Sequence, residues 1–524
     1  MRGFGTVCCW VSVAAGLMGC AAGAQPAPEF RALWADTFHA GMRNSNEVAA
    51  LVNMVRGANF NAIIVEVRKR CDAYYDSAIE PKASDVSPQS YDPLADLLDK
   101  AHHGGRRIEV HAWITTYLVW NAGGALPTQA NHPYYTHPEW LSRDSTGATS
   151  DGNNYQFDPA LPEVQRHTYD VAMDILSRYD VDGFHFDYVR YSGRTWGYHS
   201  NALERFRRRF NVAGTPSPAD ANWLQFRREQ VSGLVRKVYL NALAMKPQVK
   251  ISAATIGFAP GVVNDSQWFS SASAWGNVLQ DWRGWMQEGI LDLNVPMMYF
   301  DHRRHANDWN GWSLFAKEHA YGHHVALGQG SYLNTLSNVI HQLRTTRVPT
   351  ANSNAAAHGL AMYSYAAPVT NDTSAVTTFN ALVQPSVYDP NPVPLFAEPV
   401  ATPVMPWKVA PTVGHVKGTI RATAASDELD GAVVTLAGPV TRVQTNDATG
   451  FYGFAHLPPG SYTVTASYSN LASRSAAVLV TTGVVSTVDL FLSVSNGPLL
   501  NLRAWPERGG TGRQRAAKIS ALRD

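Results

Sequence analysis

Residues 181–188 (VDGFHFDY) combine acidic, basic and aromatic side chains in one short run. In an extended strand successive side chains point to opposite faces, so Gly183, His185 and Asp187 share one face and the two phenylalanines the other. If the phenylalanines pack against helices, Asp187 points inward at the end of the strand. A carboxyl group there can act as an acid, a base or a nucleophile. The alternatives are substrate binding without chemistry and a structural ion pair with Arg190.

Acid–base chemistry of this kind often uses two carboxyl groups, one as the acid and the other as the nucleophile or base. Two residues are candidates for the second group. Glu66 lies near the end of the apolar run at residues 61–68, on the face that is expected to carry Arg68 as well. Asp301 lies just beyond the apolar run at residues 291–299. Glu109 also points inward, but it lies deeper in its run. Glu66 and Asp301 are about equally supported, so the partner of Asp187 stays open.

The remaining candidates are side chains suited to binding a sugar. They are Arg68, His111, Trp113, His185, Tyr188, Arg190 and Tyr299. An arginine can donate to a carboxylate and lower its pKa, and an aromatic ring at a strand end can stack on a sugar. For Trp113 the alternative is that it fills the protein interior. The two histidines can equally be hydrogen-bonded interior residues.

Neither a cofactor nor a metal is expected. Adjacent histidines occur at 102–103 and 323–324, but no cysteine or carboxylate stands at a familiar ligand spacing from them. Three of the four cysteines lie within the first 20 residues, which leaves Cys71 and excludes a fold held together by disulfides. Cys71 is more readily explained as a small residue near a strand end than as a nucleophile.

Eight short apolar runs, alternating with longer amphipathic stretches, must position these side chains. They are residues 31–38, 61–68, 107–115, 181–188, 249–257, 291–299, 325–330 and 359–365. This order is typical of an α/β protein with a closed (β/α)8 (TIM) barrel, whose active sites lie at the carboxyl ends of the strands. A doubly wound open sheet is the alternative, but it would normally carry an early Gly-rich phosphate loop, and we find none.

Two further segments follow the barrel, which we place at residues 29–385. Residues 386–412 are rich in proline and predict a stiff spacer or a strap along the barrel surface. Residues 413–494 contain seven short alternating runs, which predict a small all-β sandwich. Residues 495–524 carry an excess of Lys and Arg, with a GGTG run, and are expected to form a mobile basic tail.

Residues 1–24 have the pattern of an export signal, with Arg2, a short apolar stretch and small residues. The apolar stretch is too short for a permanent bilayer span. The sequence LMGC at 17–20 resembles a bacterial lipobox and predicts lipidation at Cys20, with attachment to a membrane of the bacterial envelope. The A-x-A pattern at 22–24 predicts ordinary secretion instead, and we favour the lipoprotein slightly.

The composition argues against a nucleic-acid partner. Only 16% of residues are charged, and 43 Lys and Arg nearly balance 42 Asp and Glu, so no polyanion-binding surface is indicated. The chain holds 15 Trp and 22 Tyr. Such rings often line sugar subsites, and several lie in the long segment 121–158. That segment can wall a groove over the barrel mouth, which favours a polysaccharide substrate.

Several phrases of the sequence resemble the glycosyl hydrolase-like 10 family (family 10 glycosylhydrolases, DUF187) in order over about residues 29–385. They are RALW at 31–34, EVRKRCDAYYDS at 66–77, EVHAW at 109–113, HPEWLSRDSTG at 137–147, FDPALPEVQ at 157–165 and VDGFHFDYVRYSG at 181–193. Separately, residues 447–467 (DATGFYGFAHLPPGSYTVTAS) resemble the carboxypeptidase regulatory-like domain, which is usually non-catalytic and commonly appended to exported enzymes.

The resemblance implies a TIM-barrel hydrolase of the bacterial envelope that cleaves O-glycosidic bonds in a polysaccharide, such as the glycan strands of peptidoglycan. Members of the family often carry Gln where this chain has Glu66. Two alternatives stay open. One is a glycan-binding protein without activity. The other is a hydrolase of another bond type, such as an amidase, because this fold supports many chemistries. The sequence has neither a GxSxG elbow nor a zinc signature to favour the latter.

Overall fold

The computed structural model describes residues 27–370, 374–422, 428–469 and 471–493. Its larger part is a closed barrel of eight parallel strands, in the order β1-β10-β9-β8-β7-β6-β3-β2. The barrel strands are β1 (Phe30–Ala35), β2 (Ala62–Arg68), β3 (Glu109–Thr115), β6 (Gly183–Asp187), β7 (Lys250–Ile256), β8 (Leu293–Met298), β9 (His324–Gly330) and β10 (Gly359–Tyr363). The predicted (β/α)8 barrel is therefore confirmed.

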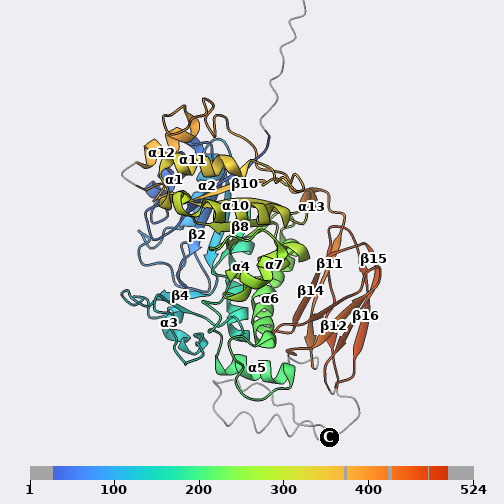
Figure 1. The fold of residues 1–524 in the computed structure, drawn as a ribbon. Helices are drawn as coiled ribbons and strands as arrows, with labels where there is room; N and C mark the ends of the chain where they lie inside the picture. Colours follow the sequence, from blue (N-terminus) through green and yellow to red (C-terminus); the bar gives the residue numbers. More distant parts are fainter. Residues whose placement is uncertain (1–26, 371–373, 423–427, 470, 494–524) are drawn as a thin grey trace, which may run out of the picture.

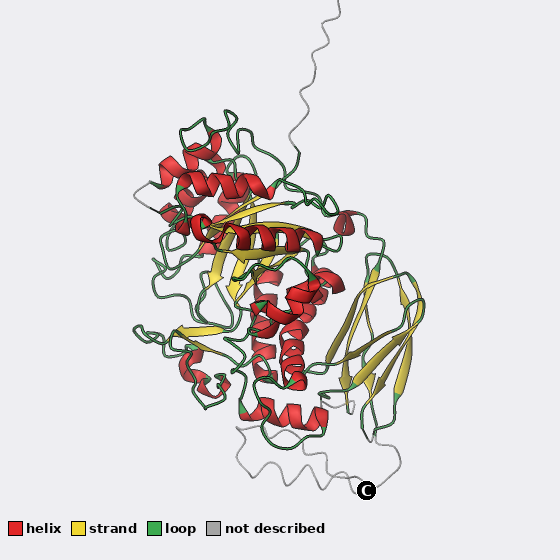
Figure 2. Ribbon diagram, viewed as in Figure 1, coloured by secondary structure: helices red, strands yellow, loops and turns green. Residues whose placement is uncertain are grey.

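Helices surround the strands (Figures 1 and 2). The longer ones are α1 (Ser45–Gly57), α2 (Pro93–His103), α4 (Pro162–Arg178), α5 (Ser200–Phe210), α6 (Ala221–Met245), α10 (His302–Glu318), α11 (Leu336–Thr346) and α12 (Ala375–Val383). Short helical turns are α3 (Pro133–Thr136), η1 (Pro138–Trp140), α7 (Asp265–Ser271), α8 (Ser273–Gly276), α9 (Trp282–Glu288), η2 (Ser331–Leu333) and α13 (Pro406–Val409).

Helix α1 shows why these segments become helices. Its buried residues Val48, Leu51, Val52 and Val55 recur at a spacing of three and four, which forms one apolar stripe against the barrel. The side chain of Asn44 caps its first turn by accepting hydrogen bonds from the next backbone N–H groups. The same local rules start α2, where a capping aspartate precedes a proline at the first helical position.

The interior of the barrel depends on a glycine at the start of β6. Gly183 lies beside His111 of β3 in the register of the sheet. A Cβ atom on residue 183 would lie 2.1 Å from Nδ1 of His111, so only glycine leaves room for the buried imidazole. Residues His185 and Asp187 follow on the same face, toward the carboxyl end of the strand.

Strand β2 contains a β-bulge that alters one of our predictions. Glu66 pairs with Trp113 of β3, but the next pair joins Arg68 to Ile114, so Val67 is an extra residue. An extra residue reverses the alternation that follows it. The prediction that Arg68 shares the inward face of Glu66 is therefore wrong. Arg68 instead lies in register with the outward side chain of Ile114.

Between β3 and β6, strands β4 (Leu118–Asn121) and β5 (Asn154–Gln156) form a small antiparallel sheet. Beyond the barrel, residues 386–412 run along its amino-terminal end. The carbonyl of Glu398 accepts from Arg31, and that of Val400 accepts from Asn61. These contacts make the proline-rich segment a strap along the barrel, which is one of the two forms that its composition allowed.

The last part of the described chain is a two-sheet sandwich, as predicted. One sheet has the order β14-β11-β17 with β18 paired to β11, and the other has the order β13-β12-β15-β16. Its strands are β11 (Gly414–Arg421), β12 (Val433–Ala437), β13 (Arg442–Thr445), β14 (Phe451–Leu457), β15 (Gly460–Ser467), β16 (Arg474–Val480), β17 (Val485–Thr487) and β18 (Leu490–Phe491).

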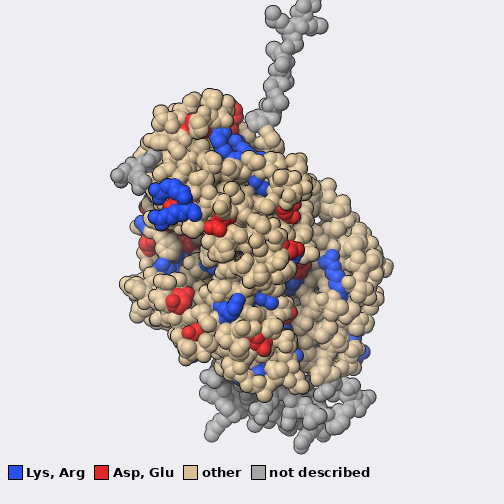
Figure 3. Space-filling model, viewed as in Figure 1, with Lys and Arg blue, Asp and Glu red and all other residues tan. Residues whose placement is uncertain are grey.

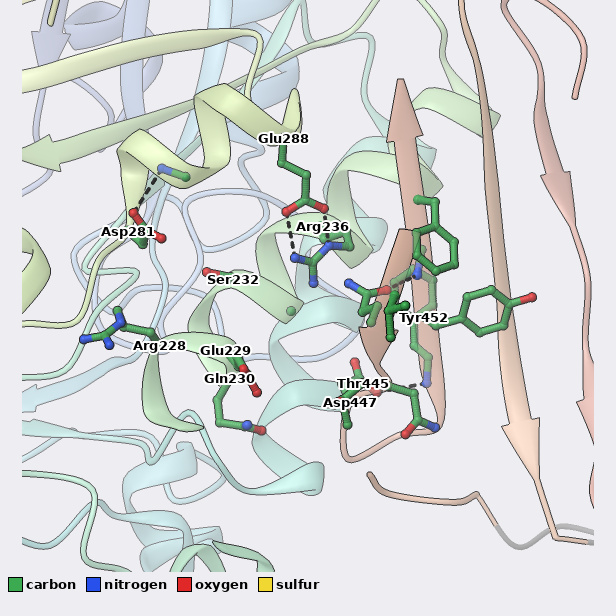
Figure 4. A pocket seen from close by; sticks show the side chains of 18 of the residues that line it. Arg228, Glu229, Gln230, Ser232, Arg236, Asp281, Glu288, Thr445, Asp447 and Tyr452 are labelled. Carbon is green, nitrogen blue, oxygen red and sulfur yellow. Dashed lines mark hydrogen bonds and ion pairs between the residues drawn. The ribbon is translucent and has the colours of Figure 1, made fainter. Parts of the chain in front are cut away.

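The sandwich lies beside helix α6 (Figure 1). Asp430 anchors it to helix α5, because its carboxylate accepts hydrogen bonds of 2.7–2.8 Å from Arg205 and of 2.7 Å from Arg208. Between the two parts is a polar cavity of about 550 Å³, lined by α6, α9, β13 and β14 (Figure 4). On its barrel side Arg236 of α6 and Glu288 of α9 form an ion pair at 2.7 Å. The sandwich is thus fixed to the barrel rather than tethered.

Over the face that Figure 3 shows, acidic and basic side chains are scattered on a largely uncharged surface. No helix of the described residues is both long enough and apolar enough to cross a membrane. The predicted signal segment with Cys20 and the predicted basic tail at 495–524 lie outside the described residues.

Candidate active site

Three carboxyl groups gather at the carboxyl ends of the barrel strands. Asp36 directly follows β1, Glu66 lies on β2, and Asp187 ends β6. The phenol of Tyr363, at the end of β10, lies close enough to all three for their negative charges to raise its pKa, in addition to the larger effect of burial. Tyr363 therefore marks the centre of an acidic cluster at the barrel mouth, where the active sites of this fold lie.

Asp187 is almost enclosed, with 5% of its surface exposed. The backbone N–H of Tyr188 donates to its Oδ1 at 2.6 Å, and Nη1 of Arg190 lies 3.5 Å from the same atom. Burial raises the pKa of Asp187, while Arg190, the Tyr188 N–H and Trp113 act in the opposite direction. The ion pair that we considered is thus present, but it contacts only one of the two carboxylate oxygens.

Glu66 is fully buried and differs from Asp187 in its partners. Thr37 donates twice to Oε2, through its backbone N–H and its hydroxyl group, each at 2.8 Å. Oε1 has no hydrogen-bond partner among the described residues. Burial, with a smaller contribution from Asp36, raises the pKa of Glu66 to about 8. Glu66 is therefore mostly protonated at neutral pH and can donate a proton.

Asp36 is the carboxyl group that we did not single out from the sequence. Its Oδ1 accepts from the backbone N–H groups of Phe38 and His39 and lies 2.7 Å from Nδ1 of His39. Its Oδ2 lies 3.5 Å from the hydroxyl group of Tyr363. The sequence predicts a first strand over residues 31–38, which places Asp36 inside the strand, whereas β1 ends at Ala35. An acidic residue one place beyond a shorter strand is the signal that would have found it.

Aromatic rings cover the floor and one side of the mouth. Tyr299 and Tyr363 stack at 5.4 Å between ring centroids, and Trp34 lies edge-on to both. Tyr332, which is partly exposed, packs edge-on against the same two tyrosines. Tyr299 was a sequence candidate, and the structure brings it into the cluster. Such a set of rings can bind the apolar face of a sugar.

Trp113, Tyr188 and Arg190 also lie at the mouth. The Trp113 ring is 6.5 Å from that of Tyr363. Tyr188 has a positive φ of 47°, so the backbone turns sharply just after Asp187. The guanidinium of Arg190 lies 4.2 Å from the centre of the Tyr188 ring. These contacts fix the side chains that surround the Asp187 carboxyl group.

The side chains of three other candidates, Arg68, His111 and His185, contact residues outside the acidic cluster. Arg68 forms a buried two-fold ion pair with Glu80, at 2.7 and 2.8 Å. His111 lies deep in the barrel, 3.2 Å from Glu109. The two nitrogens of His185 contact Ser252 at 2.8 Å and the Trp34 indole at 3.4 Å. The structure therefore favours the interior role that we considered for the two histidines. Through its ion pair with Glu80, Arg68 anchors the segment that carries Glu80.

Asp301 lies outside the acidic cluster. It is the N-cap of α10, where its carboxylate accepts from the backbone N–H of Arg303. It also contacts the Arg303 and Arg304 side chains at 3.1 and 3.7 Å. The hydrogen bonds from Arg303 lower its pKa. This environment suits a helix cap, whereas Glu66, like Asp187, raises the pKa of Tyr363.

We expect Asp301→Ala to keep catalytic turnover close to that of the unsubstituted protein and to lower the melting temperature slightly, because it removes a cap but no group of the acidic cluster. Release of reducing ends and a thermal melt measure the two effects. A loss of turnover of about 100-fold or more would make Asp301 a candidate for one of the catalytic carboxyl groups.

Within the described ranges, no group of three or more His, Cys, Asp or Glu side chains is arranged to hold a metal ion. Cys71 is buried and unpaired, with its Sγ 2.9 Å from Nη2 of Arg68. Burial raises the pKa of the thiol well above its usual value. A thiol in this state is a poor nucleophile.

A parallel eight-stranded barrel with carboxyl groups and aromatic rings at its strand ends has the architecture of a (β/α)8 enzyme. The model of the glycosyl hydrolase-like 10 family matches residues 29–331, which is more than half of the chain. The chain belongs to this family. Residues 415–493, which form the sandwich, match the carboxypeptidase regulatory-like domain. Both resemblances that we drew from the sequence are confirmed.

Two curated relatives match part of the chain. Glycosyl hydrolase YngK of Bacillus subtilis is 26% identical over 312 residues, 55% of this chain and 55% of YngK. Glycosyl hydrolase DigH of Escherichia coli K12 is 27% identical over 262 residues, 47% of this chain and 56% of DigH. The chain thus spans about half the length of these relatives.

A solved structure, the beta-galactosidase of the psychrophilic Marinomonas ef1, aligns with a TM-score of 0.47 at 10% identity. The alignment covers 67% of this chain and 58% of that chain. At this identity and TM-score, the alignment supports no conclusion about activity.

Proposed function

We propose that this protein is a glycoside hydrolase that cleaves O-glycosidic bonds in a polysaccharide, with Glu66 and Asp187 as its two carboxyl groups. The observation that carries the proposal is the difference between their environments. Glu66 accepts two hydrogen bonds from Thr37 and has a pKa of about 8, whereas Asp187 contacts Arg190 and a backbone N–H. Glycosidases need such an unequal pair.

In this mechanism Glu66 donates a proton to the leaving oxygen of the glycosidic bond. Asp187, ionised beside Arg190, acts on the opposite face of the sugar as nucleophile or as base toward water. The unpartnered Oε1 of Glu66 is the atom available for the proton transfer. Stacking on Tyr299 and Tyr363 would orient the sugar ring. Asp36 holds the loop after β1 and raises the pKa of Glu66.

The finer substrate in this proposal is the glycan strand of peptidoglycan. The family and the names of the two relatives support hydrolysis of glycosidic bonds in general. The signal-like first 24 residues support export, and peptidoglycan is a glycan that an exported bacterial enzyme would meet. Lipidation at Cys20 or plain secretion would both export the protein.

The test is to incubate the purified protein with peptide-free peptidoglycan strands and, separately, with a panel of other polysaccharides, and to measure new reducing ends. We expect release from at least one glycan, and release from peptidoglycan strands would support the finer substrate. Tight binding to a glycan without product from any of them would instead favour the non-catalytic glycan-binding protein.

The pH dependence of kcat/KM tests the roles of the two carboxyl groups. Because Asp187 must be ionised, the rate should rise with pH through its pKa, which burial places above the usual 3.8. Because Glu66 must be protonated, the rate should fall as the pH passes about 8. A rate that stays level from neutral pH to well above 8 would contradict the role of Glu66.

A further inference from the structure

Arg70, in the loop after β2, carries a half-buried charge without a partner. No described residue accepts a hydrogen bond from its guanidinium or forms an ion pair with it, and its Nε is buried. The guanidinium carbon lies 4.6 Å from the ring centre of Phe38 and 5.6 Å from that of Trp120. Leaving the buried Nε unpaired costs free energy, so this arrangement is expected where a ligand supplies a partner for the guanidinium.

The position of Arg70 is fixed from two sides. Its backbone N–H donates to Oδ1 of Asp72 at 2.8 Å, and its carbonyl oxygen accepts from Nε2 of His132 at 2.8 Å. His132 in turn packs edge-on against Trp120 at 5.1 Å. The guanidinium is thus held between two rings by a rigid loop, rather than free to fold back onto the surface.

Arg70 lies near the acidic cluster. Burial lowers the pKa of Arg70, and the carboxyl groups of Asp72 and Glu66 act in the opposite direction with smaller effects. The Tyr188 phenol lies within the same electrostatic range. Glu66 is mostly protonated at neutral pH, so Asp72 is the main negative charge nearby. Asp72 does not come within ion-pair distance of the guanidinium.

Two neighbouring cationic side chains, Lys69 and Arg190, already contact hydroxyl or carboxyl groups. Lys69 contacts the Tyr74 hydroxyl group and lies 3.8 Å from Asp85, and Arg190 contacts Asp187. Phe38 is 45% exposed, although Arg70 covers one part of it. The exposed ring beside an unpaired guanidinium offers an apolar surface for a sugar and a donor for a negative group attached to that sugar.

We infer that Arg70, with Phe38 and Trp120, forms a subsite for an anionic substituent on the glycan, next to the sugar whose bond is cleaved. The inference rests on the proposed function and narrows its substrate to acidic glycans. A carboxylate, a sulfate ester and a phosphate ester all offer the planar or tetrahedral oxygens that a guanidinium binds through two hydrogen bonds.

The test compares Arg70→Gln and Arg70→Lys on matched polymers: peptide-free peptidoglycan strands, the same strands after chemical reduction of their carboxyl groups, and sulfated and phosphorylated polysaccharides with their neutral parents. For the anion that fits, the ratio of kcat/KM on the acidic polymer to that on its neutral form should fall about 10- to 100-fold in Arg70→Gln. Arg70→Lys should recover part of it. Arg474→Gln, which removes an exposed arginine from the sandwich, is the control and should keep the ratio.

A ratio that is the same in Arg70→Gln and in the unsubstituted protein for every pair would overturn the subsite while leaving the glycosidase intact. If no polymer is cleaved at all, the proposed function fails, and calorimetric binding of acidic and neutral oligosaccharides decides the subsite separately. Loss of selective acidic binding in Arg70→Gln would then support it, and binding that is indifferent to charge or to Arg70 would overturn it.

Discussion

Asp187→Asn is expected to lower kcat for glycan hydrolysis by about 10²- to 10⁴-fold. The amide keeps the shape of the side chain and can still accept from the Tyr188 N–H, but it cannot ionise or take up a proton. The loss should therefore appear in kcat, with little change in the melting temperature. Initial rates of reducing-end release under saturating glycan measure it.

The matched control for this change is Asp99→Asn, which alters an exposed aspartate on helix α2 that pairs with His103 at the surface. It should leave kcat as it is. An Asp187→Asn protein that is folded and retains most of its turnover would exclude Asp187 from the chemistry. The acidic cluster would then have to act through Asp36 and Glu66.

The second large effect is on stability. Glu80→Ala should lower the free energy of unfolding by about 3–5 kcal/mol, because it leaves the buried guanidinium of Arg68 without its carboxylate. His167, whose Nε2 lies 2.8 Å from Glu80, loses the same partner. Urea unfolding followed by fluorescence measures the change.

Two comparisons sharpen this prediction. Asp99→Ala removes a surface pair in which both side chains are at least 75% exposed, and its effect should be within about 1 kcal/mol of zero. Replacing both Arg68 and Glu80 by Met and Leu should recover part of the stability lost in Glu80→Ala, since no buried charge is then left alone. A Glu80→Ala protein as stable as Asp99→Ala would show that the buried pair contributes nothing.

The same pair has a defined pH dependence. Arg68 and His167 hold the pKa of Glu80 well below its usual 4.5, against the effect of burial. A group whose pKa is lowered on folding stabilises the protein above its unfolded pKa and loses that contribution as the pH falls toward the folded pKa. The contribution of Glu80 should therefore be complete at neutral pH and decline below about 4.5.

The barrel was predictable because its signals are local and repeated. Each barrel strand shows an apolar run of period two or a continuous buried run, and helices such as α1 show one apolar stripe. The place of Asp187 at the mouth follows from the alternation within β6 alone. Its chemistry does not follow from that pattern and stays a prediction.

The parts of the site that escaped prediction depend on contacts between distant segments. The bulge at Val67 turns Arg68 outward, and a one-residue insertion leaves no mark in the hydrophobic pattern. The pairing of Arg68 with Glu80 and the proximity of Asp36 to Tyr363 join different loops. The attachment of the sandwich through Asp430 to Arg205 is of the same kind. Only the folded chain brings these groups together.

One experiment tests directly whether the carboxyl groups at the barrel mouth catalyse hydrolysis. A glycan that the protein degrades is incubated in water enriched in the heavy oxygen isotope, and the products are examined by mass spectrometry. We expect each new reducing end to carry one heavy oxygen, and Asp187→Asn to yield almost none of these products in the same time. Products without the label, or equal labelled product from Asp187→Asn, would contradict it.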